Sequence, residues 1–535
     1  MKKVISKNYV LAILSSFLLI PGWYEWGTGL TLMVAFIPIL VIIQRYINVD
    51  RGGRRVYLLS SLCILLWNIG DTWWIKNASF AGLLAALFVS TFFMSWPLWF
   101  TYKTWKRWGR TPGLFAFIVF WIAFEFAYTF GEISWPWLTL GNGFAYEVKL
   151  IQWYEVTGTM GGSLWVLLAN VLIYLSVFST NNKIEFNRKF AIISAAIIII
   201  PLVVSIVRYN TYEEVPNPRR VVVVQPNIDP YMKFNDIPPI EQTHIQVKLA
   251  HALSDSTVDY VVAPETSIMN NIWISRFDEV PDFKVVSSFQ ELYPQMKYIT
   301  GIMCYKQYDP DEKRTNTAKP YRNSDKWYDS FNSAIQIDST DSIQLYHKSK
   351  LVVGVEKMPY PGALKILKSL TLRLGGTFRS HATQAERGVL SSPGDSVKVA
   401  PVICYESVFG EFVTDYVKKG ANVIFVITND GWWGDTPGHR QHNSLSSVRA
   451  IETRRSVARS ANTGISSFIN QRGDVLQSLG WWKRGALIDN INLNNKQTFY
   501  TRYGDYIGRA AFYSSILIAL SLLSIALRKK KARIN

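Results

Sequence analysis

Residues 399–412 read VAPVICYESVFGEF, a run of small and β-branched residues that ends at Cys404 and then turns polar at Tyr405 and Glu406. A short, continuous apolar run of this kind predicts a buried strand. The pattern from 407 to 418 predicts a helix directly after it. Ligands of layered sheets commonly bind beyond the carboxyl ends of strands. A cysteine at this point is therefore a candidate for chemistry as well as for packing.

The long segment around this stretch, residues 208–509, alternates strand and helix patterns. Strands are predicted at 219–228, 256–266, 296–304, 330–338, 396–404, 422–430 and 464–473, and helices at 238–253, 407–418 and 440–459. Such alternation predicts a layered α/β domain with sheets inside and helices outside.

Apolar runs on both sides of this segment predict a membrane protein. They lie at 8–24, 28–44, 56–74, 79–101, 113–131, 162–179, 190–207 and 510–527, and a bilayer's hydrocarbon core takes about 20 helical residues. The first run follows lysines like a secretory signal, but no small-residue cleavage site precedes the next run, so we expect a membrane helix. The predicted fold class is a polytopic α-helical membrane domain of eight transmembrane helices plus an α/β domain. The predicted domains are 1–207, 208–509 and 510–535, the last comprising a transmembrane helix and a basic tail.

The net charge of +18 reflects topology. Most of the basic excess lies in the two tails and in alternate loops, at Lys2, Lys3, Lys7, Arg45, Arg51, Arg54, Arg55, Lys103, Lys106, Arg107, Arg110, Lys183, Arg188, Lys189, Arg528, Lys529, Lys530, Lys531 and Arg533. Positive charge marks the cytoplasmic side of a membrane. We therefore expect both termini in the cytoplasm, 208–509 on the outer face, and no nucleic-acid partner.

Three segments are predicted to meet lipid. The outer loops 21–29 (PGWYEWGTG) and 133–144 (ISWPWLTLGNGF) are rich in aromatic residues, which either anchor in the headgroup region or line a lipid entry path. Residues 362–378 (GALKILKSLTLRLGGTF) combine Leu and Ile with basic residues. They predict an interfacial amphipathic segment or an ordinary surface helix, with Gly375 and Gly376 as a hinge for a lid.

The chain has three cysteines, Cys63, Cys304 and Cys404. Cys63 lies inside a predicted membrane helix and is expected to be core. Cys304 and Cys404 each end an apolar strand in the outer domain, where disulfides are permitted. A Cys304–Cys404 bridge, an inert buried thiol and a nucleophile all stay open for Cys404.

A nucleophilic cysteine needs a base and a cation near the developing oxyanion, and the chain offers both at other strand ends. VVAPETS (261–267) places Glu265 just past a strand, and LYHKSKL (345–351) places Lys348 at the end of another, with Glu356 eight residues on. A carboxylate after a strand is commonly a solvated loop residue or a helix cap. Glu, Lys and Cys together, each after a strand of one sheet system, favour a catalytic site.

No metal or cofactor is predicted. His439 and His442 lie close to TNDGWWGD (428–435), but no third residue stands at metal-ligand spacing. The chain has no Gly-rich phosphate-binding loop.

These motifs resemble the nitrilase superfamily, whose members carry a Glu–Lys–Cys triad on an αββα sandwich. The matching patterns are P-E at Pro264–Glu265, Y-x-K-x-x-L from Tyr346 to Leu351, C-Y-E at 404–406, TNDGWWGD, and TRYGD at 501–505. With the eight predicted spans, the whole chain resembles the apolipoprotein N-acyltransferases, the membrane-embedded members of that superfamily.

The resemblance implies roles for the matched positions. Cys404 would be the nucleophile, Glu265 the general base and Lys348 the cation that stabilises the oxyanion and favours the thiolate. The supporting residues it implies are Glu356, Tyr405, Glu406 and Trp432.

The resemblance also implies the reaction and its partners. A phospholipid's sn-1 acyl group would pass to the cysteine as a thioester, and then to the α-amine of a lipoprotein's diacylglyceryl-cysteine. The setting would be the bacterial cytoplasmic membrane, with the protein a monomer. Two alternatives stay open: a membrane-anchored amidase in which water resolves the acyl-enzyme, and a non-catalytic lipid- or lipoprotein-binding module.

Overall fold

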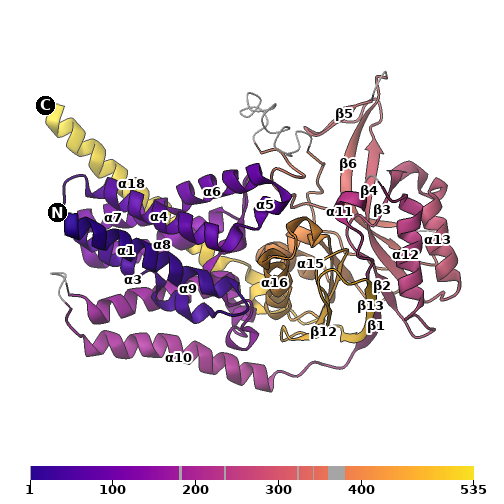
Figure 1. Ribbon diagram of the computed structural model, residues 1–535, viewed down its shortest axis with the longest axis horizontal. Coiled ribbons are helices and arrows are strands. Elements are labelled where there is room, and N and C mark those ends of the chain that lie inside the picture. The colour runs from indigo at the N-terminus through magenta and orange to yellow at the C-terminus, as the bar shows by residue number, and fades with distance from the viewer. Residues whose placement is uncertain are drawn as a thin grey trace. The chain divides into compact units, whose positions relative to one another are not determined.

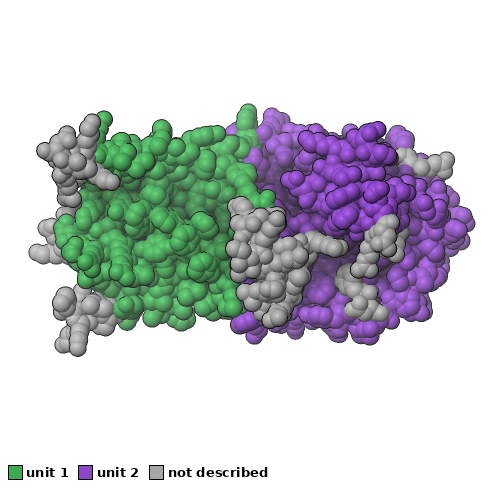
Figure 2. Space-filling view, turned by 90° about the horizontal axis from the view of Figure 1, so that it is seen from above, with its two compact units in different colours: residues 1–73, 82–211, 503–535 green, residues 74–81, 212–502 purple. Residues whose placement is uncertain are grey.

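The computed structural model describes residues 2–179, 184–233, 236–321, 324–340, 343–359 and 380–534 (Figure 1). The chain divides into two compact units (Figure 2). Unit 1 comprises residues 1–73, 82–211 and 503–535, and unit 2 comprises residues 74–81 and 212–502. The predicted amphipathic segment 362–378, with its two glycines, lies outside the described residues.

Unit 1 is helical. Its longer helices are α1 (Lys2–Leu19), α3 (Ile37–Tyr46), α4 (Gly52–Thr72), α6 (Phe80–Met94), α7 (Trp96–Trp108), α8 (Arg110–Ala127), α9 (Tyr154–Val177), α10 (Arg188–Thr211) and α18 (Tyr506–Ile534). Shorter pieces are α2 (Leu32–Ala35) and the 3-10 turns η1 (Ile20–Trp23), η2 (Gly29–Thr31), η3 (Pro136–Leu138), η4 (Leu140–Phe144) and η5 (Val148–Leu150).

Within the described residues, six helical segments are long and apolar enough to cross a membrane. They are Gly29–Tyr46, Phe80–Trp108, Arg110–Ala127, Tyr154–Val177, Arg188–Thr211 and Tyr506–Arg528, and each overlaps one of the eight predicted spans. The remaining two predicted spans fall mainly on α1 and α4, which are not among these six segments, so a count of eight stays a prediction. On α10, apolar side chains such as Ile200 are more than half exposed, which suits a helix surrounded by lipid.

The two aromatic outer loops fold partly into unit 1. Trp23 and Trp137 are almost completely buried, and the indole N–H of Trp23 donates to the carbonyl of Trp137 at 3.3 Å. Trp26, by contrast, is 72% exposed. Headgroup anchoring therefore suits Trp26, whereas Trp23 and Trp137 tie the two loops to each other.

Unit 2 contains two mixed β-sheets. The larger has eight strands in the order β13-β1-β2-β4-β6-β5, with β3 beside β4 and β7 beside β6; the smaller has the order β12-β11-β10-β9-β8. The strands of the larger sheet are β1 (Pro218–Gln225), β2 (Tyr260–Val262), β3 (Ile268–Trp273), β4 (Lys297–Gln307), β5 (Lys319–Pro320), β6 (Trp327–Ile337), β7 (Gln344–His347) and β13 (Gly485–Asn492). Those of the smaller are β8 (Val399–Ile403), β9 (Val423–Thr428), β10 (Val457–Ala461), β11 (Ser466–Ile469) and β12 (Val475–Leu479).

The sheets pack face to face between two helical layers. Tyr260 of β2 meets Phe425 of β9 with ring centroids 5.4 Å apart, and the Ser460 hydroxyl of β10 donates to the carbonyl of Val224 in β1. Helices α12 (Pro239–His251) and α13 (Pro281–Glu291) cover the larger sheet, and α15 (Gly410–Lys418) and α16 (Pro437–Thr453) cover the smaller (Figure 1). The expected αββα sandwich is confirmed.

The predicted helix 440–459 is wrong at its carboxyl end. Helix α16 stops at Thr453 because Arg454 adopts a left-handed backbone conformation, with φ at 50°. The chain then enters β10, whose Val457 pairs with Ile424 of β9. The pattern also missed β3, β5, β12 and β13, which are short or lack a continuous apolar run.

Candidate active site

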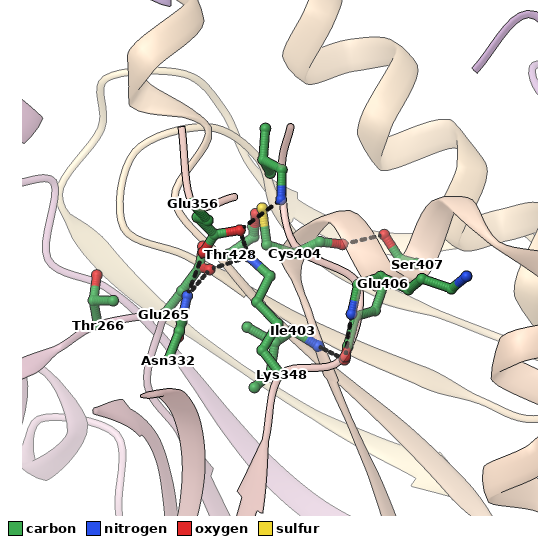
Figure 3. A network of polar contacts seen from close by, with 12 residues as sticks. Glu265, Thr266, Asn332, Lys348, Glu356, Ile403, Cys404, Glu406, Ser407 and Thr428 are labelled. Carbon is green, nitrogen blue, oxygen red and sulfur yellow. Dashed lines mark hydrogen bonds and ion pairs between the residues drawn. The ribbon is translucent and has the colours of Figure 1, made fainter. Parts of the chain in front are cut away.

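Three predicted catalytic residues lie together where strands of both sheets end (Figure 3). Glu265 follows β2 after a short turn, Lys348 comes directly after β7, and Cys404 comes directly after β8. Residues far apart in the sequence thus meet because strand ends of the two packed sheets share one edge.

Lys348 lies between two carboxylates. Its ammonium is 2.8 Å from Glu265 Oε1 and 2.9 Å from Glu356 Oε2, and its side chain is 1% exposed. The amide Nδ2 of Asn332 donates to Oε1 of Glu265 at 2.8 Å and to Oε1 of Glu356 at 2.9 Å. Lysine and amide together fix the position of both carboxylates.

These contacts set the charges of the cluster. Burial alone would lower the pKa of Lys348, but Glu265 and Glu356 outweigh it and raise that pKa well above its usual value. Burial alone would raise the pKa of Glu356, but Lys348 and hydrogen bonds from Val352 and Asn332 hold it below its usual value. The ion pair of Lys348 and Glu356 therefore favours the charged form of both side chains.

The Cys404 thiol is protonated at rest. Burial raises its pKa most, Glu265 raises it further, and Lys348 and a hydrogen bond with Thr428 act in the opposite direction. Lys348 was expected to favour the thiolate. It does lower the pKa of Cys404, but burial and Glu265 together outweigh it. A buried thiol with a raised pKa needs a base to become a nucleophile, and Glu265 is the carboxylate with the largest effect on that pKa.

The backbone at Cys404 is strained. Its φ is 50°, a left-handed conformation that costs about 1–2 kcal/mol for a residue with a Cβ. Its carbonyl oxygen accepts from the Ser407 hydroxyl at 2.7 Å and lies 3.1 Å from His442 Nε2. These contacts hold the sharp turn that presents the thiol at the strand end.

His442 belongs to a buried polar network under Cys404. Its Nδ1 is 2.9 Å from Asp430 Oδ1, and Arg459 donates to Asp430 Oδ2 at 2.7 Å. All three side chains are fully buried. Among the described residues, no group of three or more His, Cys, Asp or Glu side chains could hold a metal ion.

Glu406 joins the strand ends that carry Lys348 and Cys404. Its Oε1 accepts from the Ser349 amide at 2.7 Å and the Tyr346 hydroxyl at 2.8 Å, and its Oε2 accepts from the Ile403 amide at 2.9 Å. Burial raises its pKa. Its contacts are those of a structural link between the two loops.

Tyr405 and Trp432 make aromatic contacts. Tyr405 is buried with its ring edge against Phe409, and Trp432 packs against Tyr231 with centroids 5.3 Å apart.

The Cys304–Cys404 bridge, one of the three alternatives left open for Cys404, is not formed. Cys304 and Cys404 are both free cysteines. Cys304 lies inside β4, where its sulfur is 3.3 Å from the Ser333 hydroxyl. It is therefore a buried thiol of the larger sheet.

Sequence reasoning missed several residues of the site, namely Lys233, Asn332, Thr428, Asp430 and Arg459. Asn332 could have been found, because SFNSAIQID places polar side chains inside a strand that is otherwise apolar. A buried amide in a strand needs hydrogen-bond partners, and here they are the two carboxylates.

Two family models match the chain. Residues 220–500 match the carbon-nitrogen hydrolase family, and residues 15–172 match the apolipoprotein N-acyltransferase N-terminal domain. A protein of Chlorobaculum tepidum named apolipoprotein N-acyltransferase is 29% identical over 97% of both chains. One of Geobacter metallireducens with the same name is 24% identical over 98% of this chain and 96% of its own. A solved amidase from Nesterenkonia sp. is 14% identical, covering 55% of this chain and 95% of its own, with a TM-score of 0.35.

Proposed function

We propose, from the premise that this chain belongs to the carbon-nitrogen hydrolase family, that it is an apolipoprotein N-acyltransferase of the bacterial inner membrane. The observation that carries the proposal is the buried cluster of Glu265, Lys348 and Cys404 in a chain that also matches the N-terminal domain of those acyltransferases. Full-length similarity to relatives with that name supports it.

In the first half-reaction, Glu265 takes the thiol proton and the Cys404 sulfur attacks the carbonyl carbon of a phospholipid's sn-1 ester. The Lys348 ammonium stabilises the tetrahedral oxyanion. Collapse breaks the ester C–O bond, and the lysophospholipid oxygen takes the proton from Glu265. The acyl group stays on sulfur as a thioester.

In the second half-reaction, the α-amine of a lipoprotein's diacylglyceryl-cysteine attacks the thioester carbonyl. Glu265 accepts the amine proton, the C–S bond breaks, and the thiolate takes that proton back. The product is an N-acylated lipoprotein, and the enzyme returns to its starting state. A general base contributes about 10²–10⁴-fold to such steps.

The proposal also covers the membrane topology, the supporting residues and the oligomeric state. We infer eight spans with both termini in the cytoplasm, and a catalytic domain within 208–509 on the outer face, where the lipoprotein acceptor is found. Charge asymmetry of the loops supports this orientation. Glu356 and Glu406 act as supporting residues, Tyr405 and Trp432 shape the surrounding pocket, and the protein acts as a monomer.

The test begins with detergent-purified protein and phosphatidylethanolamine, without lipoprotein. Intact mass is measured before and after neutral hydroxylamine, beside Cys404→Ser and the matched control Cys304→Ser. The proposal requires a long-chain adduct that hydroxylamine removes, that Cys404→Ser lacks and that Cys304→Ser keeps.

A diacylated lipopeptide should then discharge the adduct as an amide. Discharge to free fatty acid at the same rate with and without lipopeptide would instead identify an amidase. Absence of any adduct would favour a binding module.

A further inference from the structure

A second lysine lies against the proposed general base. Lys233 ends the short helix α11 (Pro230–Lys233), and its ammonium donates to the backbone carbonyl of Glu265 and to the Thr266 hydroxyl, each at 3.1 Å. The residue is 2% exposed. Within the described part of the chain, no carboxylate forms an ion pair with it. The two half-reactions above do not use this lysine.

Lys233 contacts a strained turn formed by Glu265 and Thr266. Thr266 has φ at 49°, an outlier for a β-branched residue, and it directly follows Glu265. From the opposite side, the Gly301 amide donates to the Pro264 carbonyl at 3.0 Å and the Ser267 amide donates to the Gly301 carbonyl at 2.7 Å. The turn that carries the base is thus held by β4 on one side and by Lys233 on the other.

Lys233 itself is held in place. The side-chain amide of Gln242, on α12, donates to the Lys233 carbonyl at 2.7 Å, and Gln242 is fully buried. The position of the ammonium is therefore set by the surrounding fold.

The charge of Lys233 also matters to the cluster. Two carboxylates, Glu265 and Glu356, share the single cation Lys348; Glu265 and Lys348 are buried, and the Glu356 side chain is 14% exposed. Burial lowers the pKa of Lys233 to about 7, and Glu265 acts to raise it. An ammonium buried beside a carbonyl and a hydroxyl alone is costly, and an apolar side chain of the same length would avoid that cost. The carboxylate of Glu265 offsets part of that cost, because its charge favours the protonated form of Lys233.

We propose that Lys233 is a positioning residue for the general base: it holds the left-handed turn that presents Glu265 and supplies the positive charge that balances the carboxylates of the cluster. It acts through Glu265, so the inference rests on the proposed function of that residue. In its protonated form, Lys233 adds positive charge to the cluster in which the Cys404 thiolate must form.

The test uses the full chain with Lys233→Met, which keeps the length of the side chain and removes the charge, and Lys233→Arg, which keeps the charge. The matched control is Lys248→Met, at an exposed lysine of α12. Two quantities are measured: the single-turnover rate of acylation by phosphatidylethanolamine, and the rate of Cys404 alkylation by iodoacetamide as a function of pH. Thermal unfolding is followed in parallel.

We expect Lys233→Met to slow acylation by about 10²-fold, as a misplaced base would, with KM unchanged. The pH of half-maximal alkylation should rise by about one unit, and Lys233→Arg should restore most of both. If Lys233→Met does not fold, Lys233→Gln, which keeps an N–H donor without the charge, takes its place.

A wild-type rate and alkylation profile in Lys233→Met would overturn the proposal. So would a loss that follows the unfolding temperature alone and that arginine does not restore. If wild-type protein forms no acyl adduct, the proposed function fails, but the alkylation profile still reports whether Lys233 acts on the thiol.

Discussion

A single methyl group on β4 should displace the proposed general base. A Cβ built at Gly301 would lie 2.5 Å from the Thr266 amide nitrogen, 2.6 Å from Glu265 Cα and 2.9 Å from the Glu265 carbonyl carbon. Ordinary contact begins at 3.4 Å, and every atom met is backbone. In Gly301→Ala, the turn that carries Glu265 must therefore move by about 1 Å, a displacement that can cost about 10²-fold in rate.

The same displacement strains the two hydrogen bonds that join Gly301 to Pro264 and Ser267. Overpacking of this kind destabilises by about 1–3 kcal/mol, which lowers the unfolding temperature by at most about 2–4 °C for each kcal/mol in a domain larger than about 150 residues. We therefore expect a protein that still folds but acylates about 10²-fold more slowly. The measurements are the single-turnover rate of acyl-enzyme formation from phosphatidylethanolamine and thermal unfolding.

Gly480→Ala is the matched control, because no atom lies within 4 Å of a Cβ at Gly480. It should leave the acylation rate and the unfolding temperature unchanged. The reasoning is refuted if Gly301→Ala acylates at the wild-type rate, since the turn would then tolerate the methyl group without moving Glu265.

Three further predictions concern charges and thiols. Glu356→Gln removes one of the two carboxylates that hold Lys348 and should slow acylation by about 10–10²-fold. The control is Glu386→Gln, at an exposed residue paired with Lys419, which should acylate at the wild-type rate. Equal single-turnover rates in the two variants would contradict this prediction. Although burial alone would raise the pKa of Asp430, His442 and Arg459 hold it well below its usual range, so the unfolded chain takes up a proton below about pH 4 that the folded chain does not. The free energy of unfolding should therefore fall as the pH is lowered from about 5 to 3, as monitored by denaturant titration; a flat profile would count against the buried ion pair. Thiol titration in denaturant should find all three cysteines free, and Cys304→Ser should keep at least about half of the acylation rate; a mass gain of two hydrogens on reduction would show a disulfide instead.

Much of the site could be predicted from the sequence because Glu265, Lys348 and Cys404 each follow an apolar run. A strand end is visible in a linear pattern, and strand ends of packed sheets meet at one edge. The approximate positions of the strands that carry them could be predicted for the same reason.

The remainder depends on three-dimensional contacts. Lys233 ends a four-residue helix whose sequence shows no periodicity, and only the fold brings it to the carbonyl of Glu265. His442 reads as one of two histidines near an acidic motif, and its contact with the Cys404 carbonyl depends on how α16 packs against the smaller sheet. Strand β10 is short and partly polar, so nothing in VARSA distinguishes it from the end of a helix until Arg454 is seen to adopt a left-handed conformation.

The pairing of β1 with β13 makes unit 2 an insertion with adjoining ends. The chain enters this unit at 212 and leaves it at 502, and Pro218 of β1 lies opposite Asn492 of β13. Domains with neighbouring ends can be excised, or inserted into another protein, with short linkers. Residues 212–502 could therefore be expressed alone or inserted into another protein. Residues 212–502 alone would lack residues 74–81. In this segment, Trp74 packs on Trp433 with ring centroids 4.8 Å apart, and Asn77 donates to the Trp433 carbonyl. A truncated protein comprising unit 2 alone would therefore need residues 74–81 as well, either fused to it or added as a separate peptide.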